Sequence, residues 1–549
     1  MEIAPMAAEP ARTSRPWELG AARQDGSAGA RVAGTGGARL KWWLTVAALA
    51  AVAPCFAAVD DATRDAVAEL PHFVEEVRAA WGVPGVAVAV VRDGRVVYSA
   101  GIGRRDLESG GDITGQTVFS VGSATKAFTA AAIGMLVDEG AVNLDQPVRA
   151  YLPGLELFDE YVASHLTVRD LLAHRSGIER HDALWYRSEQ GRQELLERLR
   201  FLRPGAGLRE RFSYSNLMYM VAGRVVERVS GGTWEEFVQR RIFDPLGMSR
   251  SGFGSPPAGD RDVAMPHGID RNGGVAAVPR YTGWAAGPAI SIRSCADDLA
   301  RWVQLLQGRG AFGGRRLLAE ATVEEMFTPQ MAVSALGPPE IPISSYGLGW
   351  FVESYRGRLM VSHAGAIDGF YSIVVLLPAD RLGVVVLTNA SQHRVPEVVS
   401  RWVVDRFLGL PEVSWDTRLR AQEERLREER RAAELAREAQ RRIGTSPTVP
   451  VEALAGRYRH PAYGDIVIAA GDDGLAATFH GMTGPLEHFQ DDAFLFKVRG
   501  WGLRDEFVVR FQYASDGAVA SLLTTLEDKV PPEVFLRLGT AGGDPQPGP

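Results

Sequence analysis

Two apolar runs joined by an Asp-Gly turn constrain the fold of this chain most strongly. The runs Gly85–Val91 and Arg95–Tyr98 flank Asp93 and Gly94, and this pattern is typical of a β-hairpin. Three further strands are expected in the same region, at 357–362, 371–377 and 382–389. Because a helix-rich stretch separates them from the hairpin, the order predicts an α+β fold with one antiparallel sheet flanked by helices.

The chain has 549 residues, of which 46% are hydrophobic, and this is enough for a large core and more than one domain. Short alternating strands broken by Asp-Gly turns predict that the C-terminal region is a small all-β barrel or sandwich. The segments expected are an extension that is disordered or lies upstream of the true start (1–38), a signal peptide (39–58), a large region of mixed helices and strands (59–410), a charged helical linker (411–448) and a β-rich domain (449–540).

The apolar run Leu44–Ala53 follows Lys41 and two tryptophans and precedes small residues, which is the arrangement of a secretory signal. It is shorter than the roughly 20 residues that span a bilayer comfortably. We therefore expect an exported protein, periplasmic or secreted. The alternative is an uncleaved anchor, which would tie the protein to a membrane through residues 42–58.

The formal net charge of −7 is modest for this length and gives no basic surface for nucleic acid. Only Cys55 and Cys295 are present, so no disulfide framework is expected, and Cys295 is interpreted as a core thiol. No phosphate loop or zinc-binding helix pattern occurs. The expected partner is a small-molecule or peptide substrate, with no metal and no cofactor, and the sequence does not give the oligomeric state.

Ser123 and Lys126 are three residues apart at the start of an apolar helix expected from Ala124 to Glu139, so their side chains lie on one face. A serine hydroxyl needs a base to become a nucleophile, and a lysine can act as one only when it is neutral. Because an unperturbed lysine has a pKa of about 10.4, the site must lower it by roughly three, at a cost of about 4 kcal/mol.

Lysine is rare in this chain, and that rarity strengthens the interpretation of Lys126. Of 60 basic residues only four are lysines, and Lys126 is the only one between residues 60 and 410. Arginine cannot lose its proton in a protein, whereas lysine can. The exception at this position therefore favours a proton-transfer role over an incidental surface lysine.

Two further short motifs carry polar groups suited to the same chemistry. Tyr214 near an ammonium could act as a base or as an acid to a leaving group, and Asn216 could bind a substrate amide. The alternative for this segment is a turn before a helix capped by Ser215 or Asn216. His363 and Gly365 follow a strand where small residues would let a substrate approach the strand edge.

In the order Ser-x-x-Lys, Tyr-x-Asn and His-x-Gly, these motifs resemble the signatures of the penicillin-recognising serine hydrolases. That family includes class C β-lactamases, D-alanyl-D-alanine carboxypeptidases, D-aminopeptidases and related esterases. The resemblance covers about 350 residues and is supported by three further segments, Leu171–Ile178, Phe243–Met248 and Gly347–Trp350. It implies a β-lactamase/transpeptidase-like α/β sandwich. The linker and tail also resemble a C-terminal domain found behind such hydrolases.

The resemblance implies that Ser123 is the acylated nucleophile and Lys126 its proton partner. Tyr214 would act as a base in acylation or deacylation. Which of Lys126 and Tyr214 takes the first proton is disputed across such enzymes, and the sequence leaves this open. Asn216 would bind a substrate amide, and the oxyanion would lie between the backbone N–H groups of Ser123 and Ala366.

One motif departs from the class C pattern, which has Lys-Thr-Gly where this chain has His363, Ala364 and Gly365. A neutral histidine would hold a carboxylate less well than lysine does, and this favours a D-residue peptidase or esterase. The alternatives are a true β-lactamase and a non-catalytic peptidoglycan-binding protein. We also expect that Ser123 can be acylated by a small ester without residues 449–549.

Overall fold

The computed structural model describes residues 61–269, 274–333, 338–498, 506–527 and 529–539. The chain divides after Ala58 into two compact units, and every described residue belongs to the second, which runs from Val59 to Pro549. The predicted extension (1–38) and signal peptide (39–58) lie outside the described residues. Among the helices that are described, none combines the length and apolarity needed to cross a membrane.

An eight-stranded antiparallel sheet forms the centre of residues 59–410, which we call the hydrolase region after the family that its motifs resemble. The strand order is β10-β11-β12-β13-β14-β15-β1-β2. Its strands are β1 (Gly85–Arg92), β2 (Arg95–Gly103), β10 (Met331–Ala332), β11 (Ser344–Tyr346), β12 (Phe351–Tyr355), β13 (Arg358–Ile367), β14 (Phe370–Leu377) and β15 (Leu382–Thr388). The predicted hairpin is β1–β2, and Asp93 and Gly94 in its turn both have positive φ, at 52° and 73°. This conformation explains the Asp-Gly pair.

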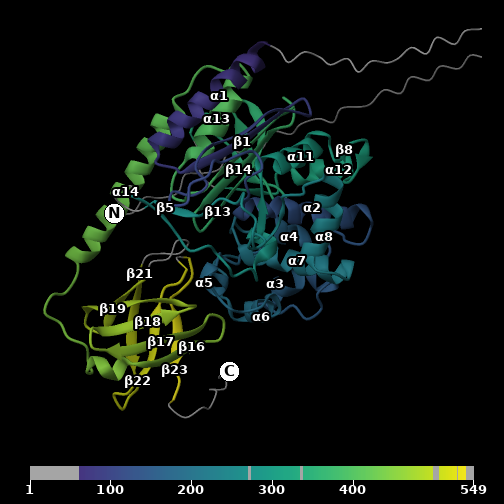
Figure 1. Cartoon of the computed structure of the whole chain (residues 1–549). Coiled ribbons are helices and arrows are strands. Elements are labelled where there is room, and N and C mark those ends of the chain that lie inside the picture. Colours follow the sequence, from purple (N-terminus) through teal and green to yellow (C-terminus); the bar gives the residue numbers. More distant parts are fainter. Residues whose placement is uncertain (1–60, 270–273, 334–337, 499–505, 528, 540–549) are drawn as a thin grey trace, which may run out of the picture. The chain divides into compact units, whose positions relative to one another are not determined.

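Alternate residues of β1 enter two different cores. Val86, Val88 and Val90 pack with α1 (Asp61–Ala80) and α13 (Val395–Phe407) on one face. Ala87, Ala89 and Val91 belong to the core of the opposite face. Because strand side chains alternate, a strand covered on both faces shows a continuous apolar run. Figure 1 shows α1 and α13 along one face and α2 and α11 at the other.

Helices fill the region between β2 and β10. They are α2 (Thr125–Asp138), α3 (Glu160–His165), α4 (Val168–Leu172), α5 (Asp182–Trp185), α6 (Arg192–Arg198), α7 (Asn216–Ser230), α8 (Trp234–Val238), α9 (Asp244–Leu246), α10 (Gly287–Ile290), α11 (Ala296–Gln307) and α12 (Glu320–Met326), with short turns of helix η1 (Gly122–Ala124), η2 (Val148–Ala150), η3 (Leu199–Phe201) and η4 (Gln239–Phe243). Small sheets are formed by β3 (Phe119–Ser120), β7 (Ile292–Ser294) and β4 (Gly252–Phe253), by β5 (His267–Ile269) and β6 (Val275–Ala277), and by β8 (Ala311–Phe312) and β9 (Arg315–Arg316). Helix α2 is buried on all sides as far as Leu136.

A long charged helix, α14 (Trp415–Ala439), follows α13, and only Trp415 and Leu419 of it are buried. The solvated helix expected here is therefore present. Glu423 pairs with Arg394 at 2.6 Å rather than with Arg427 four residues on. The ion pair with Arg394, which directly precedes α13, thus holds the first part of α14 against the hydrolase region.

The C-terminal region is a closed antiparallel barrel of eight strands, completed by pairing of the first and last (Figure 1). The strands are β16 (Gly456–His460), β17 (Gly464–Gly471), β18 (Gly474–Phe479), β19 (Met482–Gln490), β20 (Ala493–Lys497), β21 (Glu506–Tyr513), β22 (Val519–Thr524) and β23 (Glu533–Arg537), preceded by η5 (Val451–Leu454). Closure removes the exposed strand edges of an open sheet. Of the two architectures expected, the barrel is the one observed.

Candidate active site

Ser123 and Lys126 are brought together at the beginning of α2. Ser123 lies in η1 and is partly exposed, whereas the side chain of Lys126 is fully buried. The Lys126 Nζ atom is 3.1 Å from Ser123 Oγ. The predicted pair therefore forms, with an accessible hydroxyl beside a buried amine.

The surroundings of Lys126 fit a neutral amine. Nζ donates to Asn216 Oδ1 at 2.6 Å and to the Ala289 carbonyl oxygen at 3.1 Å, and neither of these atoms can donate a hydrogen. An ammonium would donate a third hydrogen bond to Ser123 Oγ, whereas a neutral amine has only two N–H groups and its lone pair can accept from the Ser123 hydroxyl. Burial holds the pKa of Lys126 well below its usual value, Arg180 lowers it further, and Asp182 opposes this shift.

Tyr214 lies beside this pair with its ring 4.7 Å from Lys126 Nζ. The Arg180 guanidinium carbon is 5.1 Å from the centre of the same ring. Burial raises the pKa of Tyr214 to about 12, although Arg180 and a hydrogen bond with Ser123 act in the opposite direction. At neutral pH the side chain is therefore a phenol, which can donate a proton but is a poor base.

Asn216, the first residue of α7, is fixed by two partners of opposite kind. Its Oδ1 accepts from Lys126, and its Nδ2 donates to Asp182 Oδ1 at 2.9 Å. Asp182 is in turn held by Arg180 Nε at 2.8 Å and by Trp185 Nε1 at 2.9 Å. The amide keeps one N–H that these bonds do not use, and this group can meet a substrate carbonyl.

Strand β13 approaches η1 so closely that only glycine fits at two positions. A Cβ on Gly365 would lie 2.0 Å from the Val121 carbonyl oxygen and 2.7 Å from the Ser123 nitrogen. A Cβ on Gly122, whose φ is 52°, would lie 2.8 Å from the Ala366 nitrogen. The two glycines thus bring together the backbone segments that carry both predicted oxyanion donors.

His363 also lies on β13 and is buried, but its ring is engaged within the protein. Its Nδ1 is 2.6 Å from the Ala364 carbonyl oxygen and therefore donates, and its Nε2 accepts from the Tyr346 hydroxyl at 2.9 Å. Burial, aided by the charge of Lys126, lowers the pKa of His363 to about 3. The neutral ring leaves neither nitrogen for a substrate and cannot replace a lysine cation.

Three functional neighbours were not identified from the sequence. His174 packs its ring 4.2 Å from that of Tyr214, and its Nδ1 accepts the backbone N–H of Ser215 at 3.1 Å. This bond satisfies one backbone N–H at the N-terminus of α7, where the Ser215 side chain makes no capping bond. Arg180 and Asp182 have no signal in the sequence, whereas His174 lies in the matching segment Leu171–Ile178.

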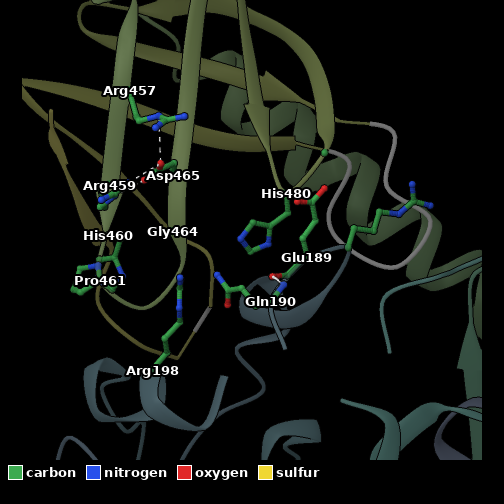
Figure 2. A pocket seen from close by; sticks show the side chains of 13 residues that line it. Glu189, Gln190, Arg198, Arg457, Arg459, His460, Pro461, Gly464, Asp465 and His480 are labelled. Atoms are coloured by element: carbon green, nitrogen blue, oxygen red, sulfur yellow. Dashed lines mark hydrogen bonds and ion pairs between the residues drawn. The ribbon is translucent and has the colours of Figure 1, made fainter. Parts of the chain in front are cut away.

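The described structure also has a pocket, which is lined by residues other than those of the candidate site. Within the ranges described, no group of three or more His, Cys, Asp or Glu side chains could hold a metal ion. A pocket of about 740 Å³ lies where the hydrolase region meets the barrel, and Figure 2 shows its lining. Its arginines are paired, Arg187 with Asp368 and Arg459 with Asp465.

Comparison with known proteins agrees with this geometry. A family model described as Beta-lactamase matches residues 70–406, and a model of a domain of unknown function, DUF3471, matches residues 440–535. An unguisins hydrolase of Aspergillus violaceofuscus is 30% identical over 451 residues, which cover 74% of this chain and 77% of that protein.

Solved structures resemble the chain over much of its length. The octameric penicillin-binding protein homologue from Pyrococcus abyssi has a TM-score of 0.57 at 25% identity, covering 85% of this chain and 99% of the other. A D-stereospecific amidohydrolase from Streptomyces sp. has a TM-score of 0.50 at 26% identity, covering 64% and 99%. The predicted fold and family resemblance are confirmed, and the chain belongs to the β-lactamase family of serine hydrolases.

Proposed function

We propose that Ser123 cleaves an amide or ester through an acyl-enzyme, with Lys126 as the base of acylation. The observation that carries this proposal is the set of three partners around Lys126 Nζ, two of which can only accept. As the Ser123 oxygen attacks the carbonyl carbon, its proton passes to the Lys126 lone pair. This assignment selects between the two candidate bases that the sequence left open.

Tyr214 then serves as the acid in the same step. Its phenol, with a pKa of about 12, gives its proton to the departing nitrogen or oxygen as that bond breaks. The Lys126 ammonium can return a proton to Tyr214, because the two side chains are neighbours. In deacylation Lys126, which is neutral again, takes a proton from the water that attacks the acyl carbon. It passes this proton to the Ser123 oxygen as the bond to the acyl group breaks, and the acid product leaves.

The developing oxyanion would be held by the backbone N–H groups of Ser123 and Ala366, which β13 brings to the same place. Loss of one such donor typically costs about 3 kcal/mol of transition-state stabilisation. The remaining N–H of Asn216 would orient the substrate by donating to its amide carbonyl.

The substrate class that fits best has no free carboxylate next to the scissile bond. His363 is neutral and both its nitrogens are occupied, so β13 offers no cation there. This favours amides, esters and internal peptide bonds over the carboxylate-bearing substrates of carboxypeptidases and β-lactamases. Within that class we propose substrates that contain D-residues. A D-stereospecific amidohydrolase among the similar structures supports the same choice.

The test compares three substrates built on the same amino acid, with the wild-type protein and with Ser123→Ala. They are a D-amino-acid amide, its L-enantiomer, and the corresponding D,D-dipeptide with a free carboxylate. We expect turnover of the D-amide to exceed that of the other two, and none with the variant. Faster cleavage of the dipeptide, or of a chromogenic cephalosporin, would contradict the substrate class.

We also propose that the protein acts outside the cytoplasm after removal of residues 39–58. The support is the apolar run at 44–53 with its basic and small flanking residues. Fractionation of the source cells, followed by N-terminal sequencing, tests this proposal. A mature protein that begins before residue 39, or that stays with the membrane, would contradict it.

A further inference from the structure

The barrel contacts the segment of the hydrolase region that borders the candidate site. This segment comprises Arg180, His181 and Asp182. Arg180 lies over the ring of Tyr214, and Asp182 holds the amide of Asn216. The residue between them, His181, is fully buried, and two of its hydrogen-bond partners come from the barrel.

His181 has a backbone conformation that needs support. Its φ and ψ are 42° and 38°, in the left-handed region that a residue with a Cβ rarely adopts. It precedes α5 without giving that helix a side-chain cap. A strained residue of this kind persists only where its surroundings hold it in place.

Two barrel residues supply that support, one to the backbone and one to the side chain. The His181 N–H donates to Glu527 Oε2 at 3.0 Å, and His181 Nδ1 is 2.5 Å from the Tyr463 hydroxyl oxygen. Tyr463 lies in the turn between β16 and β17, and Glu527 lies in the connection between β22 and β23. Two separate barrel loops therefore converge on one residue.

The hydrolase region also contacts the barrel at residues that follow α5 in the chain. Arg198 Nη1 donates to the Ala462 carbonyl oxygen at 2.7 Å, next to Tyr463. His480 bonds to the Tyr463 carbonyl oxygen at 2.7 Å and so fixes that turn from the barrel side. Figure 2 shows Gln190 and Arg198 facing His460, Gly464 and His480 across the pocket.

We infer that Glu527 and Tyr463 are positioning residues of the hydrolase site, which hold His181 and through it keep Arg180 over Tyr214 and Asp182 on Asn216. This inference rests on the proposed function and gives the barrel a part in it. It also replaces the sequence-based expectation that residues 449–549 are dispensable for acylation.

The test uses Glu527→Ala, Glu527→Gln and Tyr463→Phe in the full chain, with two matched barrel controls. Tyr513→Phe removes a hydroxyl bonded to Asp492, and Glu487→Gln removes a carboxylate paired with Lys497, both within the barrel. Turnover of the D-amino-acid amide and the rate of Ser123 labelling by a fluorophosphonate are measured. Hydrogen exchange of the peptide covering 178–186 is followed in parallel.

We expect Glu527→Ala and Tyr463→Phe to lower kcat/KM by about tenfold, the effect of one lost buried hydrogen bond. Exchange in 178–186 should become faster in both, and neither control should change. Glu527→Gln keeps an oxygen that can accept the His181 N–H, so it should retain most of the activity. A pure loss of barrel stability would instead affect the controls as well.

Wild-type kinetics and wild-type exchange in Glu527→Ala and Tyr463→Phe would overturn the inference, as would equal losses in the controls. Failure of the proposed function gives a different result, in which the wild-type protein itself shows no Ser123 labelling. Exchange in 178–186 still decides the positioning role in that case, since it does not depend on turnover.

Discussion

Replacement of Lys126 by arginine tests the proposed base directly. Arginine keeps N–H donors near the Asn216 and Ala289 oxygens, but its guanidinium stays protonated at any working pH and cannot accept the Ser123 proton. A positioned general base contributes about 10²- to 10⁴-fold, so we expect Lys126→Arg to slow Ser123 acylation by about 10³-fold at pH 7. The assay is the rate of fluorophosphonate labelling, followed by intact mass.

The pH dependence gives a second, signed test of the same reasoning. Lys126 must be neutral to accept a proton, so acylation should rise with pH through its lowered pKa and then level off. Arg180 lowers this pKa and Asp182 raises it. Arg180→Gln should therefore move the rising limb to higher pH, by about one pH unit or less because Arg180 is half exposed. Asp182→Asn should move the rising limb to lower pH.

Folding is checked in each variant by thermal unfolding. A folded Lys126→Arg protein that keeps more than about a tenth of the wild-type rate would remove lysine from the mechanism. If the rising limb of the pH–rate profile shifts in the same direction in Arg180→Gln and in Asp182→Asn, a group other than Lys126 controls the pH dependence of acylation.

Three other predictions follow from the same contacts. Tyr214→Phe should slow cleavage of an amide much more than that of a p-nitrophenyl ester, whose leaving group needs no proton; equal losses would exclude the acid role. Gly365→Ala should lower the free energy of unfolding by about 1–3 kcal/mol and abolish Ser123 labelling, because β13 can no longer approach η1. The control Gly154→Ala, which has open space around the added Cβ, should change neither the unfolding in denaturant nor the labelling. Burial lowers the pKa values of His363 and His393 to about 3 and of His181 to about 4. Below pH 6.5 these histidines therefore bind protons in the unfolded chain before they do so in the folded protein. Unfolding in guanidinium should show that the free energy of unfolding falls from pH 6.5 toward pH 3, by about 2 kcal/mol per histidine at pH 5.

The pairs that the residues alone identified share one property, which is local spacing, whereas Tyr214, Asn216 and His363 were joined to Ser123 only through the family resemblance. Ser123 and Lys126 are one helical turn apart, and Asp93 with Gly94 fixes a hairpin between neighbouring strands. Such patterns are visible because the partners are close in the chain. The alternation of β1 between two cores likewise follows from a continuous apolar run.

The remaining contacts depend on residues that only the folded chain brings together. Asp182 meets Asn216 across 34 positions, and Glu527 meets His181 across 346. Arg180, His181 and Asp182 form a short polar stretch whose composition is ordinary for a loop, and the left-handed backbone of His181 has no glycine to reveal it. The sequence indicated a neutral histidine at position 363 but gave no sign that its ring would be engaged with Tyr346.

The most direct test of the account is intact-protein mass spectrometry after exposure to a fluorophosphonate and, separately, to a penicillin, with Ser123→Ala as the control. The account predicts one fluorophosphonate adduct on the wild-type protein and none on the variant. Penicillin should label it slowly or not at all, because β13 offers no cation for its carboxylate. An adduct that persists in folded Ser123→Ala, or no adduct on the folded wild-type protein, would contradict the assignment of Ser123 as the nucleophile.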